Sequence, residues 1–295
     1  MNRLLSVGDQ VKSGTYRFHS RFNRAANFER RGRLVSVVDE QIGPGPLNIV
    51  LIGPVLHFRP EGAPVGTLPP LRVTTSSVVF AGCRFAFGPR KRYRSALDVR
   101  PGGLRRLHLN LPVLRELLAA RASSKSLAFL LDEKRLENFR SGFEKAFANR
   151  IRRGAHRVFH GRLLEGIRIL KGCGVGLTPS GDDFIAGLLI GLNLLQHLGG
   201  QALQPAADAV FAAAKGDNIY SNTFLDMARR GLLFGRMKDL LVALMAGSRT
   251  SVRKAGVKLL AIGATSGADL ATGFLLTVTT GEGGIAPTRI SAPCG

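Results

Sequence analysis

The alternation of apolar and polar residues divides the chain into two parts. After Gly32, short apolar runs rich in β-branched residues are separated by Gly and Pro, a pattern typical of strands joined by turns. The runs cover residues 33–38, 47–52, 55–58, 71–73 and 77–87. We therefore predict an antiparallel β-rich sheet or barrel in an N-terminal region, residues 1–110. The Arg-rich residues 1–31 give no firm assignment.

From about residue 111 the apolar period becomes helical, with apolar residues three or four positions apart and charged residues between them. The expected helices cover residues 111–122, 134–159, 163–170, 180–195, 201–214, 221–230, 235–246 and 258–277. This pattern predicts a mostly helical domain over residues 111–295, which ends in a loose Gly- and Pro-rich tail at 281–295. The predicted fold class is α+β.

Composition and cysteine content favour a cytoplasmic globular protein. Apolar residues make up 45% of the chain and charged residues 21%, which is ordinary for a folded protein. The longest apolar run, residues 184–195, is too short for a membrane span, which needs about 20 residues. The first residues lack the continuous apolar segment of a secretory signal. Cys83, Cys173 and Cys294 are far apart and without a CxxC pair, so we expect reduced thiols and no membrane partner.

The net charge of +22 is concentrated in the first part of the chain. Residues 1–165 hold 30 Lys or Arg and 12 Asp or Glu, whereas residues 166–295 hold 12 and 8. Such an excess attracts anions, whether a small substrate, an acidic partner or nucleic acid. Because the basic residues are dispersed and no nucleic-acid-binding motif accompanies them, we expect a small anionic substrate and not nucleic acid.

The segment GCGVGLTPSGDD, residues 172–183, contains more residues that destabilise a fold than any other stretch of similar length. Alternating glycines and a Thr-Pro turn precede two adjacent acids, Asp182 and Asp183, at the start of an apolar helix. Glycines lose the most entropy on folding, and adjacent carboxylates repel each other. We therefore interpret this segment as a backbone built to approach a ligand.

An echo of this motif occurs later, in residues 263–275. Ser180-Gly181-x-Asp183 aligns with Ser266-Gly267-x-Asp269, and Gly187 aligns with Gly273. A serine followed by an acid before an apolar helix resembles a capping box, so helix capping is one explanation of the shared Ser and Asp residues and ligand binding is the other. The two helices are then expected to pack closely through their glycines, around a pseudo-twofold axis.

Two residues of the first copy have no counterpart in the second, and these are the stronger functional candidates. Asp182 aligns with Ala268, and Thr178 aligns with Ala264. A helix N-terminus after glycines favours phosphate, but the P-loop and dinucleotide signatures are absent. The two acids would repel a bare phosphate. The ligand should therefore offer N–H donors or bring a divalent cation, held by Asp182 and Asp183 if a metal binds at all.

The motif GxGLTPSGDDF followed by AGLL resembles a bacterial family that includes the AllH-type subunit of oxamate carbamoyltransferase. Weaker likenesses follow in order at residues 22–27, 32–48, 221–231 and 266–269. Val175 stands where the family usually has proline, and ATSGAD at 264–269 replaces a family motif that contains His and Trp. The resemblance is specific at the glycine loop and depends elsewhere on the order of the segments.

The resemblance implies a subunit of a multi-subunit enzyme of allantoin catabolism that transfers a carbamoyl group between oxalurate, phosphate and carbamoyl phosphate. Other protein subunits are then its expected partners, and no cofactor is indicated beyond the conditional cation. The candidate catalytic residues are Asp182, Asp183 and Thr178. The candidate substrate-binding residues are Gly174, Gly176, Ser180, Gly181, Ser221, Ser266, Gly267 and Asp269.

Two alternatives stay open at the level of sequence. In the first, the chain is a structural or regulatory subunit in which the loop and its echo only cap helices. In the second, the basic residues of the first part bind nucleic acid. Cys173 is interpreted as a small packing residue in preference to a nucleophile, and His156 and His160 as part of a basic solvated face.

Overall fold

The computed structural model describes residues 3–53, 55, 67–98, 103–200 and 202–280. It separates into two compact units, Met1–Leu97 with Leu232–Lys238, and Asp98–Gly231 with Asp239–Gly295. The predicted strand at 55–58, apart from Val55, and the predicted tail at 281–295 lie outside the described residues. None of the helices in the described ranges combines the length and apolar character of a membrane span.

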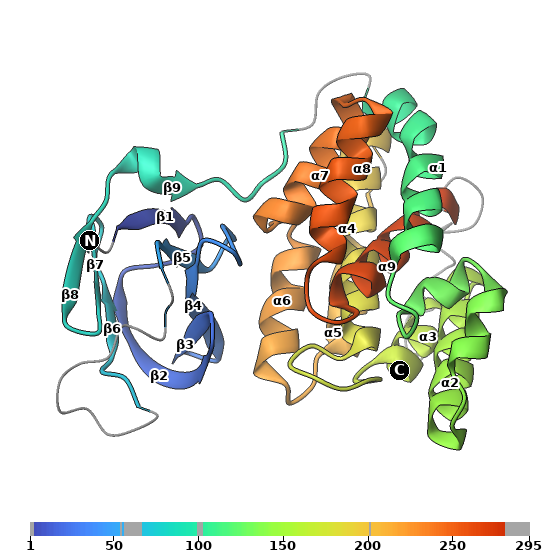
Figure 1. Cartoon of the computed structure of the whole chain (residues 1–295), viewed down its shortest axis with the longest axis horizontal. Coiled ribbons are helices and arrows are strands. Elements are labelled where there is room, and N and C mark those ends of the chain that lie inside the picture. Colours follow the sequence, from blue (N-terminus) through green and yellow to red (C-terminus); the bar gives the residue numbers. More distant parts are fainter. Residues whose placement is uncertain (1–2, 54, 56–66, 99–102, 201, 281–295) are drawn as a thin grey trace, which may run out of the picture. The chain divides into compact units, whose positions relative to one another are not determined.

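The first unit is a curled nine-stranded sheet with the strand order β8-β7-β6-β2-β3-β4-β5-β1-β9 (Figure 1). Its strands are β1 (Leu4–Gly8), β2 (Gly14–Phe22), β3 (Ala25–Arg30), β4 (Arg33–Asp39), β5 (Asn48–Leu51), β6 (Leu71–Val73), β7 (Ser77–Phe80), β8 (Cys83–Ala86) and β9 (Arg92–Tyr93). Most neighbours are antiparallel, and β4 with β5 and β1 with β9 are parallel. The expectation of an N-terminal β-rich sheet is confirmed.

Strands β1 to β3 come from the Arg-rich segment that gave no assignment. In this segment Val7 and Phe28 are fully buried, and the Phe28 ring meets the Phe80 ring edge to face at 6.0 Å. Asn27 is buried and joins three strands, because its amide donates to Ser20 of β2 and its carbonyl accepts from Ser36 of β4. Apolar anchors and one polar network therefore fix this part of the sheet.

The second unit is helical, as predicted. Its elements are α1 (Gly103–Arg121), η3 (Leu127–Leu130), η4 (Glu133–Asn138), α2 (Gly142–Phe159), α3 (Leu163–Leu170), α4 (Ser180–Gly199), α5 (Gln204–Ala214), α6 (Ile219–Arg229), α7 (Gly235–Ala246), α8 (Arg249–Leu260) and α9 (Ser266–Thr280). The first turn of α7, up to Lys238, is counted with the first unit. The single helix predicted over residues 134–159 is divided, because Ser141 begins a new helix with a capping box to Glu144. A further helix, α8, replaces an expected basic connecting segment.

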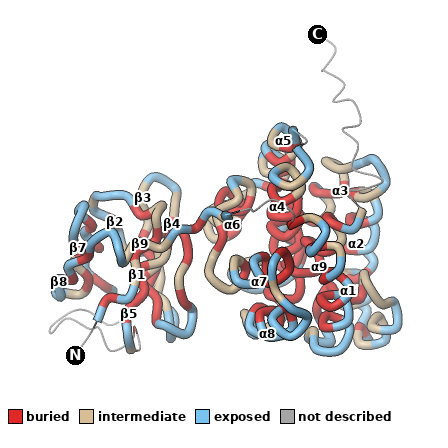
Figure 2. The backbone as a smooth tube through the Cα atoms, turned by 90° about the horizontal axis from the view of Figure 1, so that it is seen from above, coloured by how far each residue is buried: buried red, intermediate tan, exposed pale blue. Residues whose placement is uncertain are grey.

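Helix α4 is the centre of this unit. Every residue from Ser180 to Leu194 is buried, and Figure 2 shows the buried colour along its length. Helices α1, α3, α5, α6 and α9 all contact it. A helix that is apolar on all sides requires neighbours on all sides, and these helices supply them.

The most intimate contact of α4 is with α9, and glycines make it possible. A Cβ added at Gly187 would lie 2.0 Å from the Leu270 carbonyl oxygen, and one at Gly273 would lie 2.1 Å from the Phe184 oxygen. Gly187 matches Gly273 in the echo, and Phe184 matches Leu270. The two helices thus contact each other reciprocally, as the predicted pseudo-twofold axis requires.

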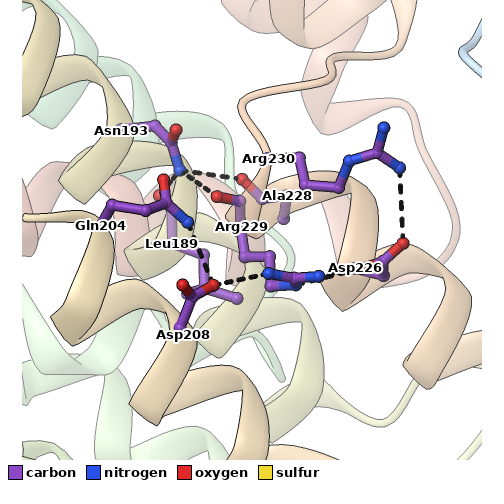
Figure 3. Close-up of polar contacts among 8 residues, drawn as sticks. All are labelled: Leu189, Asn193, Gln204, Asp208, Asp226, Ala228, Arg229 and Arg230. Atoms are coloured by element: carbon purple, nitrogen blue, oxygen red, sulfur yellow. Dashed lines mark hydrogen bonds and ion pairs between the residues drawn. The ribbon is translucent and has the colours of Figure 1, made fainter.

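Helix α6 is held against α4 by polar contacts at its C-terminal end (Figure 3). The Asn193 amide of α4 donates to the carbonyls of Ala228 and Arg229 in the last turn of α6. Arg229 forms ion pairs with Asp208 of α5 and Asp226 of α6. This network fixes α6, whose first turn lies beside the glycine loop.

We predict that Gly187→Ala lowers the free energy of unfolding by ~1–3 kcal/mol, because the new methyl group overlaps the backbone of α9. Gly199→Ala in the same helix is the matched control, since nothing lies within 4 Å of its added Cβ. We expect that change to be neutral or slightly stabilising. Urea denaturation of both variants measures the difference, and equal midpoints would contradict the close contact.

Candidate functional site

The glycine loop, residues 172–178, projects from the fold between α3 and α4. Gly172, Gly174 and Gly176 have φ angles of 66°, 117° and 103°, a region that other residues rarely adopt. A Cβ at Gly174 would lie 2.7 Å from the Ser180 nitrogen, whereas Gly176 has open space around it. Val175 is 85% exposed. Glycine is therefore required for backbone conformation at all three positions and for close approach at Gly174.

The backbone amides of this loop are available to a ligand. Across residues 174–178, no backbone N–H donates a hydrogen bond to any other described residue. The loop runs into the N-terminus of α4, where the helix dipole adds positive potential. Consecutive free amides at such a helix end form a cradle suited to an oxyanion.

Asp182 fixes the first residue of the loop. Its buried side chain accepts a hydrogen bond of 2.8 Å from the Gly172 N–H. The carboxylate therefore holds the backbone at the start of the loop, and it is buried. The sequence associates Asp182 with the glycine loop, and in the structure its carboxylate holds the backbone of Gly172 in that loop.

Asn218, which the sequence did not single out, supports the other end of the loop. Its amide donates to the Leu177 carbonyl at 2.8 Å, and its Oδ1 accepts from Tyr220 and Ser221 at the start of α6. One side chain thus caps α6 and anchors the loop. An asparagine directly before a helix is a common N-cap, so the capping role of Asn218 has a local signal in the sequence. Its bond to the Leu177 carbonyl has none, because the two residues are distant along the chain.

The expected capping box at the two SGxD motifs does not form. Ser180 is the first residue of α4, and the N-cap is Pro179, which makes no side-chain capping bond. Instead the hydroxyls cross between the helices, since Ser180 bonds to Asp269 and Ser266 bonds to Asp183. The close contact at Gly187 and Gly273 explains the exchange, because it brings the first turns of the two helices together.

Asp183 and Asp269 are buried at the paired ends of these parallel helices. Their exposures are 2% and 0%, and in each the Oδ2 atom has no hydrogen-bond partner among the described residues. Thr178 also bonds to Asp183, and the Leu127 N–H donates to Asp269 at 2.6 Å. The two acids thus connect the glycine loop, both helices and η3.

Burial raises the pKa of both carboxyls. Desolvation, opposed by Ser266 and reinforced by the charge of Asp269, raises the pKa of Asp183 to about 8. Desolvation also raises the pKa of Asp269 to about 6, and hydrogen bonds from Leu127, Ser180 and Thr265 limit the rise. At neutral pH the first acid therefore carries a proton more often than the second.

The remaining candidates have simpler environments. Gly181 and Gly267 are packing residues, because an added Cβ would lie 2.0 Å from the last-turn carbonyls of Leu170 and Leu259. Ser221 is buried in the first turn of α6, with no partner for its hydroxyl in the described part of the chain. Each of these residues lies within the second unit.

Neither a metal site nor a reactive thiol emerges in this region. The described residues contain no group of three or more His, Cys, Asp or Glu that could hold a metal, and Asp182 is already bonded to the loop backbone. The donor set therefore does not fit the divalent cation that the sequence left open. Burial raises the pKa of the Cys173 thiol, which donates to the Ile169 carbonyl. This is the environment of a packing residue.

Comparison with known proteins gives a match to a family model that covers part of the chain. Residues 170–278 match the model of the oxamate carbamoyltransferase subunit AllH family. The match begins at the end of α3 and ends within α9, so it contains the glycine loop, Asn218 and both buried acids. The resemblance read from the loop is confirmed over these residues, and the weaker likenesses at residues 22–48 stay predictions. No curated protein and no solved structure gives a significant match.

The raised pKa values predict a particular dependence of stability on pH. A carboxyl whose folded pKa lies above its unfolded pKa of ~3.9 binds more protons in the folded state, so its contribution falls as pH rises between those values. Relative to Asp183→Asn, the wild type should lose stability from pH ~4 to about 8, at up to ~1.4 kcal/mol per pH unit.

Relative to Asp269→Asn, the corresponding loss should be complete by about pH 6. Urea denaturation of the three proteins at intervals from pH 4.5 to 9 would measure both windows, with the wild type referenced to each variant at every pH. If both differences stayed constant with pH, the carboxyls would not be titrating as their burial requires.

Proposed function

We propose that the chain is a subunit of an enzyme similar to oxamate carbamoyltransferase, acting in allantoin catabolism in the cytoplasm together with other protein subunits. Its reaction would move a carbamoyl group between oxalurate and phosphate. The observation that carries the proposal is the run of free amides at residues 174–178, which lies inside the region that matches the family.

The reaction needs a site for oxyanions. A phosphate oxygen forms a bond to the carbamoyl carbon of oxalurate, the bond from that carbon to the oxamate nitrogen breaks, and the nitrogen takes up a proton. Both partners are anions, and the amide cradle offers donors to one of them without a charged side chain. The free N–H groups would be directed at the oxygens that carry most charge during transfer.

The surroundings of the loop also favour an anion. The positive charge of Arg150 acts on Cys173, and the Arg150 side chain bonds to the Ile169 carbonyl just before the loop. Lys171 donates to the Lys215 carbonyl and so stays beside the loop. Two fixed cations and a helix N-terminus together lower the cost of bringing a phosphate or carboxylate to this end of the unit.

Gly176→Ala should reduce kcat/KM for carbamoyl transfer at least tenfold, because alanine disfavours the φ of 103° and moves the neighbouring amides. The assay would use the chain with its partner subunits, oxalurate and phosphate. Gly200→Ala is the matched control, with φ 67° and open space, but at the far end of α4. Equal activity of the two variants would refute the loop as the site.

A non-catalytic role in the same complex is the second candidate. It is favoured by the burial of Asp182, Asp183 and Asp269, each of which contacts the protein's own backbone or hydroxyls. In that case the loop would be a contact for another subunit, and the reacting groups would come from elsewhere in the complex.

Variants of Asp182 separate a chemical from a positioning role. Asn keeps an oxygen that can accept from Gly172, so Asp182→Asn should retain most activity, whereas Asp182→Ala loses the contact and should lower stability by ~1–3 kcal/mol. Carbamoyl-transfer assays and denaturation of both variants test this. Loss of activity in Asp182→Asn at unchanged stability would instead assign the carboxylate a direct part in the chemistry.

A further inference from the structure

The connection between α5 and α6, residues 215–218, borders the glycine loop and is bonded to it at both ends. Just before the loop, the Lys171 ammonium donates to the Lys215 carbonyl at 2.5 Å. At the end of the loop, the Asn218 amide donates to the Leu177 carbonyl at 2.8 Å. Lys215 and Asn218 are three Cα steps apart, at most ~11 Å. The lysine ammonium and the free amides of the loop therefore adjoin the same short segment.

Gly216 in this connection makes room for the lysine side chain. A Cβ added to Gly216 would lie 2.9 Å from Lys171 Cε and 3.5 Å from its Nζ, and within 4 Å it would meet no other part of the described chain beyond its own neighbours. The Asn222 side chain holds both backbone groups of Gly216, at 3.0 and 2.6 Å. The connection is therefore fixed, and the lysine lies directly across it.

The Lys171 ammonium has no counter-ion among the described residues. Lys171 is half-buried, and within that part of the chain its single hydrogen-bond partner is the Lys215 carbonyl. Arg157, half-buried in the same unit, instead forms an ion pair with Glu165 at 3.4 Å. An ammonium has three N–H donors, so two remain for a ligand. A partly desolvated cation of this kind gains most from an anionic partner.

A second polar group beside the loop also lacks a protein partner. The Ser221 N–H donates to the Asn218 side chain, whose amide holds Leu177, so the first turn of α6 lies at the end of the loop. The Ser221 hydroxyl is buried, with the residue 3% exposed, and has no partner in the described part of the chain. Buried hydroxyls are seldom left unpaired, so this observation supports a polar ligand, or a water bound to one, at this end of the unit.

A purely structural role is the alternative for the lysine. Lys215 follows the last residue of α5, so the Lys171 ammonium caps the negative end of that helix dipole. This negative end would oppose an anion at the glycine loop, and the lysine charge offsets it. A cap alone predicts effects on stability, whereas an anion contact predicts effects on binding.

We propose that Lys171 is a phosphate-binding residue of the glycine-loop site, with Gly216 as the residue that positions it. The ammonium donates to one phosphate oxygen, and the amides at residues 174–178 donate to the others. The loop offers donors without charge, and the lysine supplies the point charge that benefits a phosphate dianion most. The proposal rests on the proposed function for the reaction that uses the phosphate.

The first test measures phosphate binding by the full-length chain. In calorimetric titrations at pH 8, Lys171→Met, which keeps the stem and removes the charge, should weaken the binding of inorganic phosphate at least tenfold. Oxamate, titrated in parallel, is the carboxylate probe, and its binding should change less than twofold. Lys145→Met, at an exposed lysine of α2, is the matched control and should bind phosphate as the wild type does. Equal phosphate affinity in Lys171→Met and wild type, or a loss confined to oxamate, would overturn the proposal.

The second test examines Gly216→Ala, whose new methyl group meets the Lys171 side chain alone. In the otherwise wild-type chain this change should weaken phosphate binding at least threefold. In a Lys171→Ala background it should have no further effect, because the side chain that it displaces is gone. Gly199→Ala, with open space around its Cβ, is the control. A loss of the same size in both backgrounds would refute the positioning role of Gly216.

Kinetics and stability separate an anion contact from a helix cap. In the enzyme assembled with its partner subunits, Lys171→Met should raise KM for phosphate at least tenfold and leave kcat and KM for oxalurate nearly unchanged, as loss of a binding contact requires. Urea denaturation of the same variant measures its stability. Lower stability at unchanged phosphate affinity and KM would reduce the lysine to a cap of α5.

The phosphate contact and the proposed function fail separately. Phosphate binding that depends on Lys171, without carbamoyl transfer by the assembled enzyme, would refute the reaction and leave the phosphate site standing. Loss of phosphate binding in Gly176→Ala but not in Lys171→Met would refute the lysine contact and leave the amide cradle standing. Absence of phosphate binding by the wild-type chain, alone and assembled, would refute both.

Discussion

The contact between α4 and α9 at Gly187 and Gly273 is the constraint on which the second unit depends. At 2.0 and 2.1 Å, the positions that a Cβ would occupy already lie within the backbone of the opposite helix. Two helices in such contact, running in the same direction, must bring their N-termini together. The loops that precede them, residues 171–179 and 261–265, are therefore neighbours as a consequence of packing.

This arrangement creates an electrostatic problem at the paired helix ends. The motif places an acid in the first turn of each helix, so the contact buries Asp183 and Asp269 close enough for one charge to raise the pKa of the other. Helix dipoles favour negative charge at these ends, but burial of two like charges outweighs that benefit. The exchanged serines and the retained proton relieve the conflict.

Sequence predicted the fold class, most elements and the glycine contact, because each leaves a local or repeated pattern. It did not predict the exchange of Ser180 and Ser266, since the capping rule considers a single helix and the exchange depends on two. Asn218 was missed for a similar reason, because its bond to the Leu177 carbonyl joins distant segments. Helix α8 was hidden by its many Lys and Arg residues, although Val252, Ala255, Gly256 and Leu259 form its buried face.

The two copies of the motif share their architecture and differ in their loops, and the difference indicates where function resides. Both have the serine, the buried acid and the close glycine contact, which packing explains. The first copy alone has three glycines at positive φ in one loop, Asp182 bonded to Gly172, and Thr178 bonded to Asp183. Packing does not require a longer loop with free amides, because the second copy packs equally well without one. The second copy thus contributes to packing, whereas the first copy contributes to packing and also carries the loop with free amides.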